Sequence, residues 1–216
     1  MRPVVAIAHA NLVEGIMDIV SGWAVELEDY AGQLGYSVVD ISGMDLVYER
    51  FTEILKNTHP AVLFNFSYGG STFLIGNPVD GIMGCTLTMG KQHGGMPNNI
   101  GAVAGAVVIA YSDHSASQLG PAIIKSGSPS FAGFNESLII ASDRAETQDI
   151  FKNSLLLLAK RILEGHSMGE AVEETRDDLL KNARKYEKYE SISLPLLYNR
   201  KSLTQLGDPD WNLMEV

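Results

Sequence analysis

Short apolar runs that alternate with helical patterns are the feature that most constrains the fold of this chain. The first run, residues 3–8, is rich in β-branched side chains and has the continuous hydrophobicity of a strand buried on both faces. Further runs predict strands at residues 36–41, 61–66, 102–111 and 130–134. Strands that alternate with helices form right-handed crossovers and a parallel sheet. We therefore predict an α/β fold: a three-layer sandwich in which helices flank a mostly parallel central sheet.

Local capping signals indicate where the first helices begin and end. Asn11 and Glu14 have the spacing of a capping box, and Gly35 is a fitting C-terminal stop. Ser42 can cap a second helix. That helix should end before Pro60, because the residue that precedes a proline disfavours the helical region. These signals predict one helix after each of the first two strands.

The later part of the chain predicts two long helices and an edge strand. A leucine-rich helix is expected from residue 143 onward, and Ser167 with Glu170 forms a second capping box that opens the next helix. The apolar runs 194–198 and 203–206 suggest a last edge strand before a closing turn. The glycine-rich stretch 67–99 shows little periodicity, so we expect a loop-rich rim there, with a possible short strand around residues 83–89.

Length and composition favour one domain over residues 1–216. The 216 residues are 45% hydrophobic and 19% charged, which is the profile of neither a disordered chain nor a membrane protein. No apolar stretch reaches the roughly 18 residues of a membrane span, and the N-terminus lacks the pattern of a signal peptide. We expect a cytoplasmic protein with no membrane partner.

Charge and cysteine content argue against several functional classes. The formal charge of -10 repels phosphate backbones and the basic residues do not form a stripe, so we expect no nucleic-acid partner. Cys85 is the only cysteine, which excludes a disulfide framework and a thiolate-rich metal site within this chain. No dinucleotide fingerprint or phosphate-binding loop occurs. We predict no cofactor and no metal.

Polar side chains gather where the predicted strands end. Ligands of open α/β sheets bind at the carboxyl ends of the strands. There the sequence presents a histidine after the first strand, a Ser-Tyr-Gly-Gly segment after the third and a Ser-Asp-His-Ser segment after the most apolar run. The predicted ligand-binding residues are therefore His9, Tyr68, Gly69, Ser112, His114 and Ser115.

Segment 106–136, AVVIAYSDHSASQLGPAIIKSGSPSFAGFNE, resembles the nucleophile strand and following helix of the caspase/gingipain-like cysteine peptidases. In that family an apolar strand ends in a cysteine, a small-residue turn leads to a Leu-Gly-Pro helix, and a Gly-aromatic strand follows. Counting back from residues 119–121, the family's cysteine falls near Asp113, within two residues. Segment 61–71, AVLFNFSYGGS, is similar to the strand that closes with the family's His-Gly pair, with Tyr68 in place of the histidine.

The resemblance covers roughly residues 61–211, including the late helices and the terminal LTQLGDPDWNL segment. It implies a caspase/gingipain-like fold for the domain. The sequence differs from the family pattern at two positions: it has no cysteine near Asp113, and it has Tyr68 in place of the histidine. In the family these two positions hold the catalytic dyad. The resemblance therefore implies the scaffold without the thiol chemistry at those two positions.

Three residues remain candidates for catalysis: Cys85, His93 and Asp113. A cysteine peptidase needs a thiolate that a nearby imidazole activates, and His93 precedes a glycine as the family's histidine does. The simpler readings are that Cys85 is a small buried hydrophobe, that His93 is an exposed loop residue, and that Asp113 caps the next helix.

Two other chemistries have weaker support. His9, Asp113 and His114 offer nitrogen and oxygen ligands for a divalent metal, but their spacing matches no known motif. Ser112 and Ser115 are possible nucleophiles. Adjacent side chains at a strand end point apart, so His114 is poorly placed to activate them.

Two hypotheses follow from the sequence. In the first, the chain is a divergent, non-proteolytic relative of the caspase/gingipain-like peptidases that binds a peptide or small molecule at the carboxyl edge of the sheet. In the second, it is an active hydrolase of the cysteine-peptidase type that uses His93 with Cys85 or Asp113. Substitution at both expected dyad positions favours the first.

Overall fold

A computed structural model describes residues 2–10, 16–76, 81–84, 99–141 and 144–216 of the chain. Its centre is a six-stranded sheet in the order β2-β1-β3-β7-β8-β9. The first five strands in this order pair in parallel, and β9 is antiparallel to β8 at the edge. The predicted mostly parallel sheet is confirmed. Its strands are β1 Val4–His9, β2 Ser37–Ser42, β3 Val62–Phe66, β7 Val107–Ala110, β8 Ser130–Phe134 and β9 Leu203–Gly207.

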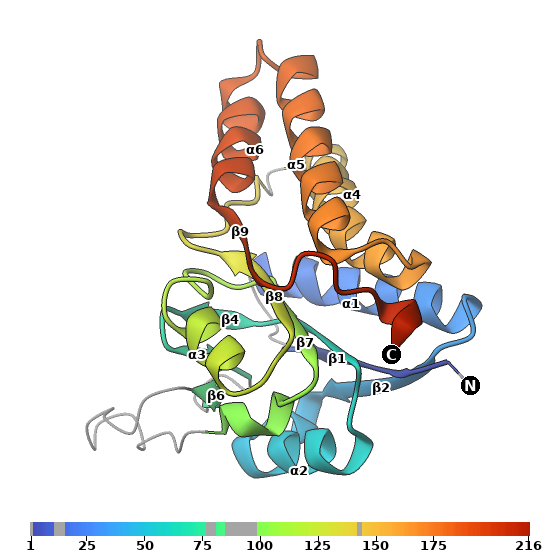
Figure 1. The fold of residues 1–216 in the computed structure, drawn as a ribbon. Coiled ribbons are helices and arrows are strands. Elements are labelled where there is room, and N and C mark those ends of the chain that lie inside the picture. The colour runs from blue at the N-terminus through green and yellow to red at the C-terminus, as the bar shows by residue number, and fades with distance from the viewer. Residues whose placement is uncertain (1, 11–15, 77–80, 85–98, 142–143) are drawn as a thin grey trace.

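Helices cover both faces of this sheet (Figure 1). Alternate residues of β1 show why: Val5 and Ile7 pack in one buried cluster, whereas Ala6 and Ala8 pack in another. The first cluster includes side chains of α1, α4 and α5, and the second those of α2 and α3. The result is the predicted three-layer sandwich. The helices are α1 Ile16–Gln33, α2 Tyr48–Thr58, α3 Leu119–Lys125, α4 Ala145–Glu164 and α5 Met168–Lys185.

A second, smaller sheet lies within the glycine-rich stretch. It is antiparallel and consists of β4 Tyr68–Gly70, β5 Phe73–Ile75 and β6 Gly81–Gly84. The prediction of a loop-rich rim was wrong for these residues, because short strands rich in glycine lack the alternating pattern by which a strand is recognised. The predicted strand around 83–89 overlaps β6 at its start, and its remainder lies outside the described residues.

α5 and the last helix, α6 Glu190–Ser202, form an antiparallel pair that extends beyond the sheet (Figure 1). The predicted edge strand is β9, but the run 194–198 belongs to α6 instead of a strand. Its buried side chains explain the helix, since they recur at every third position. They are Ser193, Leu196, Asn199 and Ser202.

The predicted helix boundaries have mixed outcomes. Gly35 follows α1 with a φ of 83°, a left-handed conformation that suits a glycine after a helix. Ser42 precedes only a 3-10 turn over Gly43–Asp45, without a side-chain cap, and α2 begins later. The 102–111 run gives the shorter β7, because residues Ile100–Val103 form a 3-10 helix. Asn11 and Glu14 lie outside the described residues.

The second capping box is present as predicted. Ser167 Oγ accepts a hydrogen bond from the Glu170 amide at 3.3 Å, and the Ser167 amide donates to Glu170 Oε2 at 3.0 Å. This hydrogen bond from Ser167 lowers the pKa of Glu170. The two reciprocal hydrogen bonds between Ser167 and Glu170 thus fix the first turn of α5.

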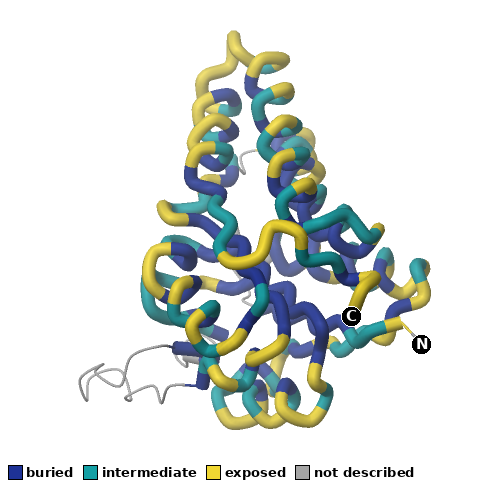
Figure 2. The backbone as a smooth tube through the Cα atoms, viewed as in Figure 1, coloured by how far each residue is buried: buried dark blue, intermediate teal, exposed yellow. Residues whose placement is uncertain are grey.

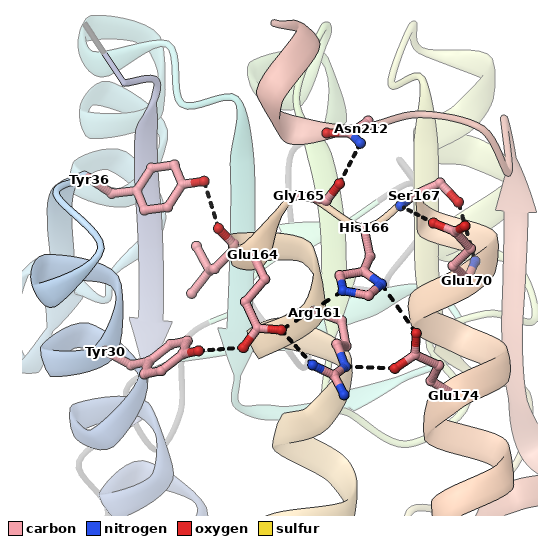
Figure 3. Close-up of polar contacts among 11 residues, drawn as sticks. Tyr30, Tyr36, Arg161, Glu164, Gly165, His166, Ser167, Glu170, Glu174 and Asn212 are labelled. Carbon is pink, nitrogen blue, oxygen red and sulfur yellow. Dashed lines mark hydrogen bonds and ion pairs between the residues drawn. The ribbon is translucent and has the colours of Figure 1, made fainter.

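Polar contacts hold the turn between α4 and α5 against α1 (Figure 3). Arg161 on α4 pairs with Glu164 and with Glu174 on α5, each at 2.6 Å. Tyr30 on α1 donates to Glu164 at 2.5 Å, and His166 Nδ1 lies 3.1 Å from Glu174. Such ion pairs near the surface contribute little one at a time, so their role is to fix the geometry of the turn.

Burial is concentrated in the central strands, whereas the outer turns of the helices are exposed (Figure 2). The last residues of the chain also reach the core, since Leu213 is buried in the cluster of α1 and α4. Asn212 Nδ2 donates to the Gly165 carbonyl at 2.5 Å. Among the described helices, none is long and apolar enough to cross a membrane.

Candidate functional site

Segments that follow β3 and β7 meet at the carboxyl edge of the sheet. Together they line a pocket with a cavity of about 40 Å³. Such a volume holds roughly three water-sized groups. Polar groups enter it from Ser67, Tyr68, Ser112 and Asp113, and the remaining wall is formed by Val20, Tyr111, Leu138 and Ile140. The structure therefore brings together two of the clusters that the sequence analysis placed at this edge.

Serine hydroxyls beneath the pocket are occupied by structural hydrogen bonds. Asn65 Nδ2 donates to Ser67 Oγ at 2.8 Å and to Ser112 Oγ at 3.2 Å. Ser112 Oγ donates to the Ser67 carbonyl at 2.5 Å, and Ser115 Oγ donates to the Ser112 carbonyl at 3.0 Å. All four residues are buried. Ser112 thus ties the end of β7 to the end of β3, and Ser115, whose Oγ also accepts a hydrogen bond from the Phe134 amide, ties the same segment to β8.

Asp113 is held at the pocket by the segment that follows β8. Its Oδ1 accepts a hydrogen bond from the Leu138 amide at 2.7 Å. Within the described residues, no Lys, Arg or His pairs with this carboxylate. The residue that precedes α3 is Gln118, so Asp113 does not cap that helix. Asp113 therefore presents an acidic group to the cavity without a basic partner.

Tyr68 stands at the mouth of the pocket, with 38% of its surface exposed. Gly69 next to it allows β4 to approach β7, because a Cβ at this position would lie 2.8 Å from Ser112 Cβ. The glycine is thus explained by close packing. Tyr111 forms the base of the pocket, where it stacks on Phe66 with ring centroids 4.5 Å apart.

His114 points away from the pocket toward the segment after β8. Its Nδ1 lies 3.3 Å from the Asn135 carbonyl and its Nε2 lies 3.3 Å from Ser137 Oγ. The backbone of His114 is in the left-handed region, with a φ of 53°. Within the described part of the chain, the imidazole forms no hydrogen bond with either candidate serine.

His9 joins a different set of residues. Its Nε2 lies 3.5 Å from Glu28 Oε1 on α1 and 3.3 Å from Asp40 Oδ1 on β2. The metal set considered from the sequence, His9 with Asp113 and His114, is not assembled. Instead, His9, Glu28 and Asp40 are the one group of three or more His, Cys, Asp or Glu in the described part of the chain whose atoms could hold a metal ion.

Sequence reasoning missed Glu28 and Asp40. Burial, followed by the charges of Asp40 and Asp29, raises the pKa of Glu28 to about 7. One signal was available, since Asp40 is the one charged residue in the predicted strand 36–41. Glu28 had none, because it is one of several acids on α1.

Cys85 and His93 lie outside the described residues. Their assignment as catalytic candidates stays a prediction. Of the three catalytic candidates, the described structure contains Asp113 alone.

The fold resembles that of gingipain R in solved structures. A crystal structure of the Arg-specific cysteine proteinase gingipain R (RgpB) has a TM-score of 0.58 at 11% identity, over 96% of this chain and 46% of that one. A complex of the RgpB pro- and mature domains from Porphyromonas gingivalis has a TM-score of 0.50 at 12% identity, over 96% and 47%. The chain thus spans less than half the length of these proteins. At this identity the likeness shows the fold alone.

Neither a protein-family model nor a curated protein sequence matches the chain.

Proposed function

We propose that this chain is a non-proteolytic relative of the gingipain-like peptidases that binds a small molecule or a peptide side chain at the carboxyl edge of the sheet. The observation that carries the proposal is the pocket in which Tyr68 and Asp113 face one cavity. These are the two positions that the family resemblance assigns to the dyad. A phenol and a carboxylate can bind a ligand, but they cannot replace the thiolate and imidazole of a cysteine peptidase.

Chemistry of the pocket favours a ligand with a cationic head group. Asp113 has no basic partner among the described residues, and the wall beside it contains the apolar side chains of Val20, Leu138 and Ile140. Charge-assisted hydrogen bonds to a carboxylate are stronger than neutral ones. A cavity of about 40 Å³ accepts a head group and not a whole peptide. An alkylammonium or alkylguanidinium group, free or on a peptide side chain, has the matching chemistry.

The test is an NMR titration of the full chain with butylammonium and butylguanidinium, with butanol as the uncharged control. We expect both cations to shift the signals of residues around the pocket, and butanol to bind more weakly. Asp113→Asn keeps the acceptor for the Leu138 amide and removes the charge. It should lower the affinity at least about tenfold, in line with the strength of a hydrogen bond to a charged group.

Asp177→Asn is the matched control, since Asp177 is an exposed acid on α5. It should leave the affinity unchanged. Cys85→Ser should also leave it unchanged if no thiol chemistry is involved. If neither cation binds, or if Asp113→Asn and Asp177→Asn behave alike, the proposal is wrong. Covalent labelling of Cys85 by a peptidyl electrophile, lost in a His93→Ala variant, would instead support the hydrolase hypothesis.

A further inference from the structure

Three structural elements bring His9, Glu28 and Asp40 together on the face of the sheet that α1 covers. His9 is the last residue of β1, Asp40 lies on the neighbouring β2, and Glu28 lies on α1. One nitrogen and two carboxylate oxygens of these residues all lie within 4.8 Å of one another. This set shares no residue with the pocket at Tyr68 and Asp113.

Two atoms of this cluster are buried without a hydrogen-bond partner in the described residues. They are His9 Nδ1 and Glu28 Oε1, and the second of these is the atom that faces the His9 imidazole. His9 as a whole is only 4% exposed. Buried polar atoms in proteins nearly always have a hydrogen-bond partner. Glu28 Oε1 has only the His9 imidazole, 3.5 Å away, so an ion bound between these two atoms would satisfy both.

The charge of the cluster also favours a cation. Two carboxylates, Glu28 and Asp40, face one buried imidazole, and Asp29 adds a further acid next to Glu28 in the sequence. No Lys or Arg of the described chain pairs with either Glu28 or Asp40. A bound cation would supply the missing positive charge.

Two distances in the cluster, both measured from the His9 nitrogen, match the ligand spacing of a small transition-metal ion. Zn²⁺ binds imidazole nitrogen and carboxylate oxygen at about 2.0–2.1 Å, so neighbouring ligands of a tetrahedral site are about 3.3 Å apart. The His9 nitrogen lies 3.3 Å from the Asp40 oxygen and 3.5 Å from the Glu28 oxygen. Ser42 Oγ donates to the other Asp40 oxygen at 3.0 Å, an arrangement that orients a ligating carboxylate.

We propose that His9 Nε2, Glu28 Oε1 and Asp40 Oδ1 bind a divalent transition-metal ion, with Zn²⁺ as the best match. The imidazole favours Zn²⁺ over Mg²⁺ or Ca²⁺, which prefer oxygen ligands alone. Three protein ligands leave a fourth tetrahedral position for water.

The experiment is an isothermal titration of the full chain, freed of metal by a chelator, with Zn²⁺. A parallel titration with Co²⁺ reports the geometry, because tetrahedral Co²⁺ has intense visible absorption. We expect one equivalent of Zn²⁺ and a tetrahedral Co²⁺ spectrum. Asp40→Asn and Glu28→Gln should each weaken Zn²⁺ binding by more than about tenfold, the lower end of what the loss of even an outer-sphere partner costs.

Asp29→Asn is the matched control. It removes one negative charge beside Glu28 but no ligand atom, so it should retain the Zn²⁺ affinity within a few-fold. The Asp40 side chain is half exposed, and circular dichroism would establish that Asp40→Asn is folded.

Other metal-binding side chains must be separated from this site. A variant with Cys85→Ser, His93→Ala and His166→Ala should keep one equivalent of Zn²⁺ and the Co²⁺ spectrum. The proposal is overturned if the full chain binds no stoichiometric Zn²⁺. It is equally overturned if the triple variant loses the site, or if Asp29→Asn weakens binding as much as Asp40→Asn.

Discussion

At the scale of single residues, Gly69 sets how closely the small sheet approaches the end of β7. Any Cβ there would lie 2.8 Å from Ser112 Cβ and 3.1 Å from the Phe73 carbonyl. Neither neighbour is the end of a flexible side chain, so the backbone of β4 would have to move. A shift of β4 would also displace Ser112 and its hydrogen bonds, and the shape of the pocket would change.

We predict that Gly69→Ala lowers the free energy of unfolding by about 1–3 kcal/mol, the usual cost of overpacking. Gly22→Ala is the control, because Gly22 lies in α1 with nothing within 4 Å of its added Cβ. Alanine has the higher helix propensity, so that variant should gain up to about 1 kcal/mol. Urea unfolding of both variants measures the difference, and equal effects would contradict the packing argument.

Residues of the two sites differ in how well sequence could predict them. Tyr68 and Asp113 were placed at one edge because the carboxyl ends of parallel strands must meet there. Glu28 and Asp40 could not be placed with His9, since their approach depends on how α1 packs over β1 and β2. That packing is a tertiary property, which no local pattern records.

At the scale of the elements, α5 depends on its capping box. We predict that Ser167→Ala destabilises the protein by about 1 kcal/mol, because the Glu170 amide loses its acceptor. Ser167→Asp restores an acceptor and should recover most of this loss. Thermal unfolding at a fixed pH measures both changes. A Ser167→Ala variant as stable as the unchanged protein would show that the cap contributes nothing.

The predicted strand 130–134 was confirmed, whereas the apolar run 194–198 was assigned to the wrong type of element, because tertiary contacts determine its conformation. The run 130–134 matches β8 because a doubly buried strand is apolar throughout. The run 194–198 is also apolar, but it lies in α6, where Leu196 is buried in the core cluster that includes residues of α5 and Leu194 is exposed. A short apolar run does not distinguish these two outcomes.

At the scale of the whole molecule, the last residues complete the core that the first strands begin. Leu213 is fully buried in the cluster that contains residues of β1, α1 and α4. We predict that Leu213→Ala costs about 2–5 kcal/mol, the usual range for a leucine truncated in a core. Met214→Ala, at a half-exposed neighbour, should cost much less. Denaturant unfolding compares them, and similar midpoints would place Leu213 outside the cooperative core.

β2 ends the central sheet, and Asp40 projects from it half exposed. The outer side of an edge strand carries backbone groups that can pair with a strand of another molecule. Such pairing would place a second chain beside the half-exposed Asp40 carboxylate and remove part of its water. The same residue that faces His9 therefore also limits self-association, and a chain with an apolar residue at position 40 would be more prone to aggregate.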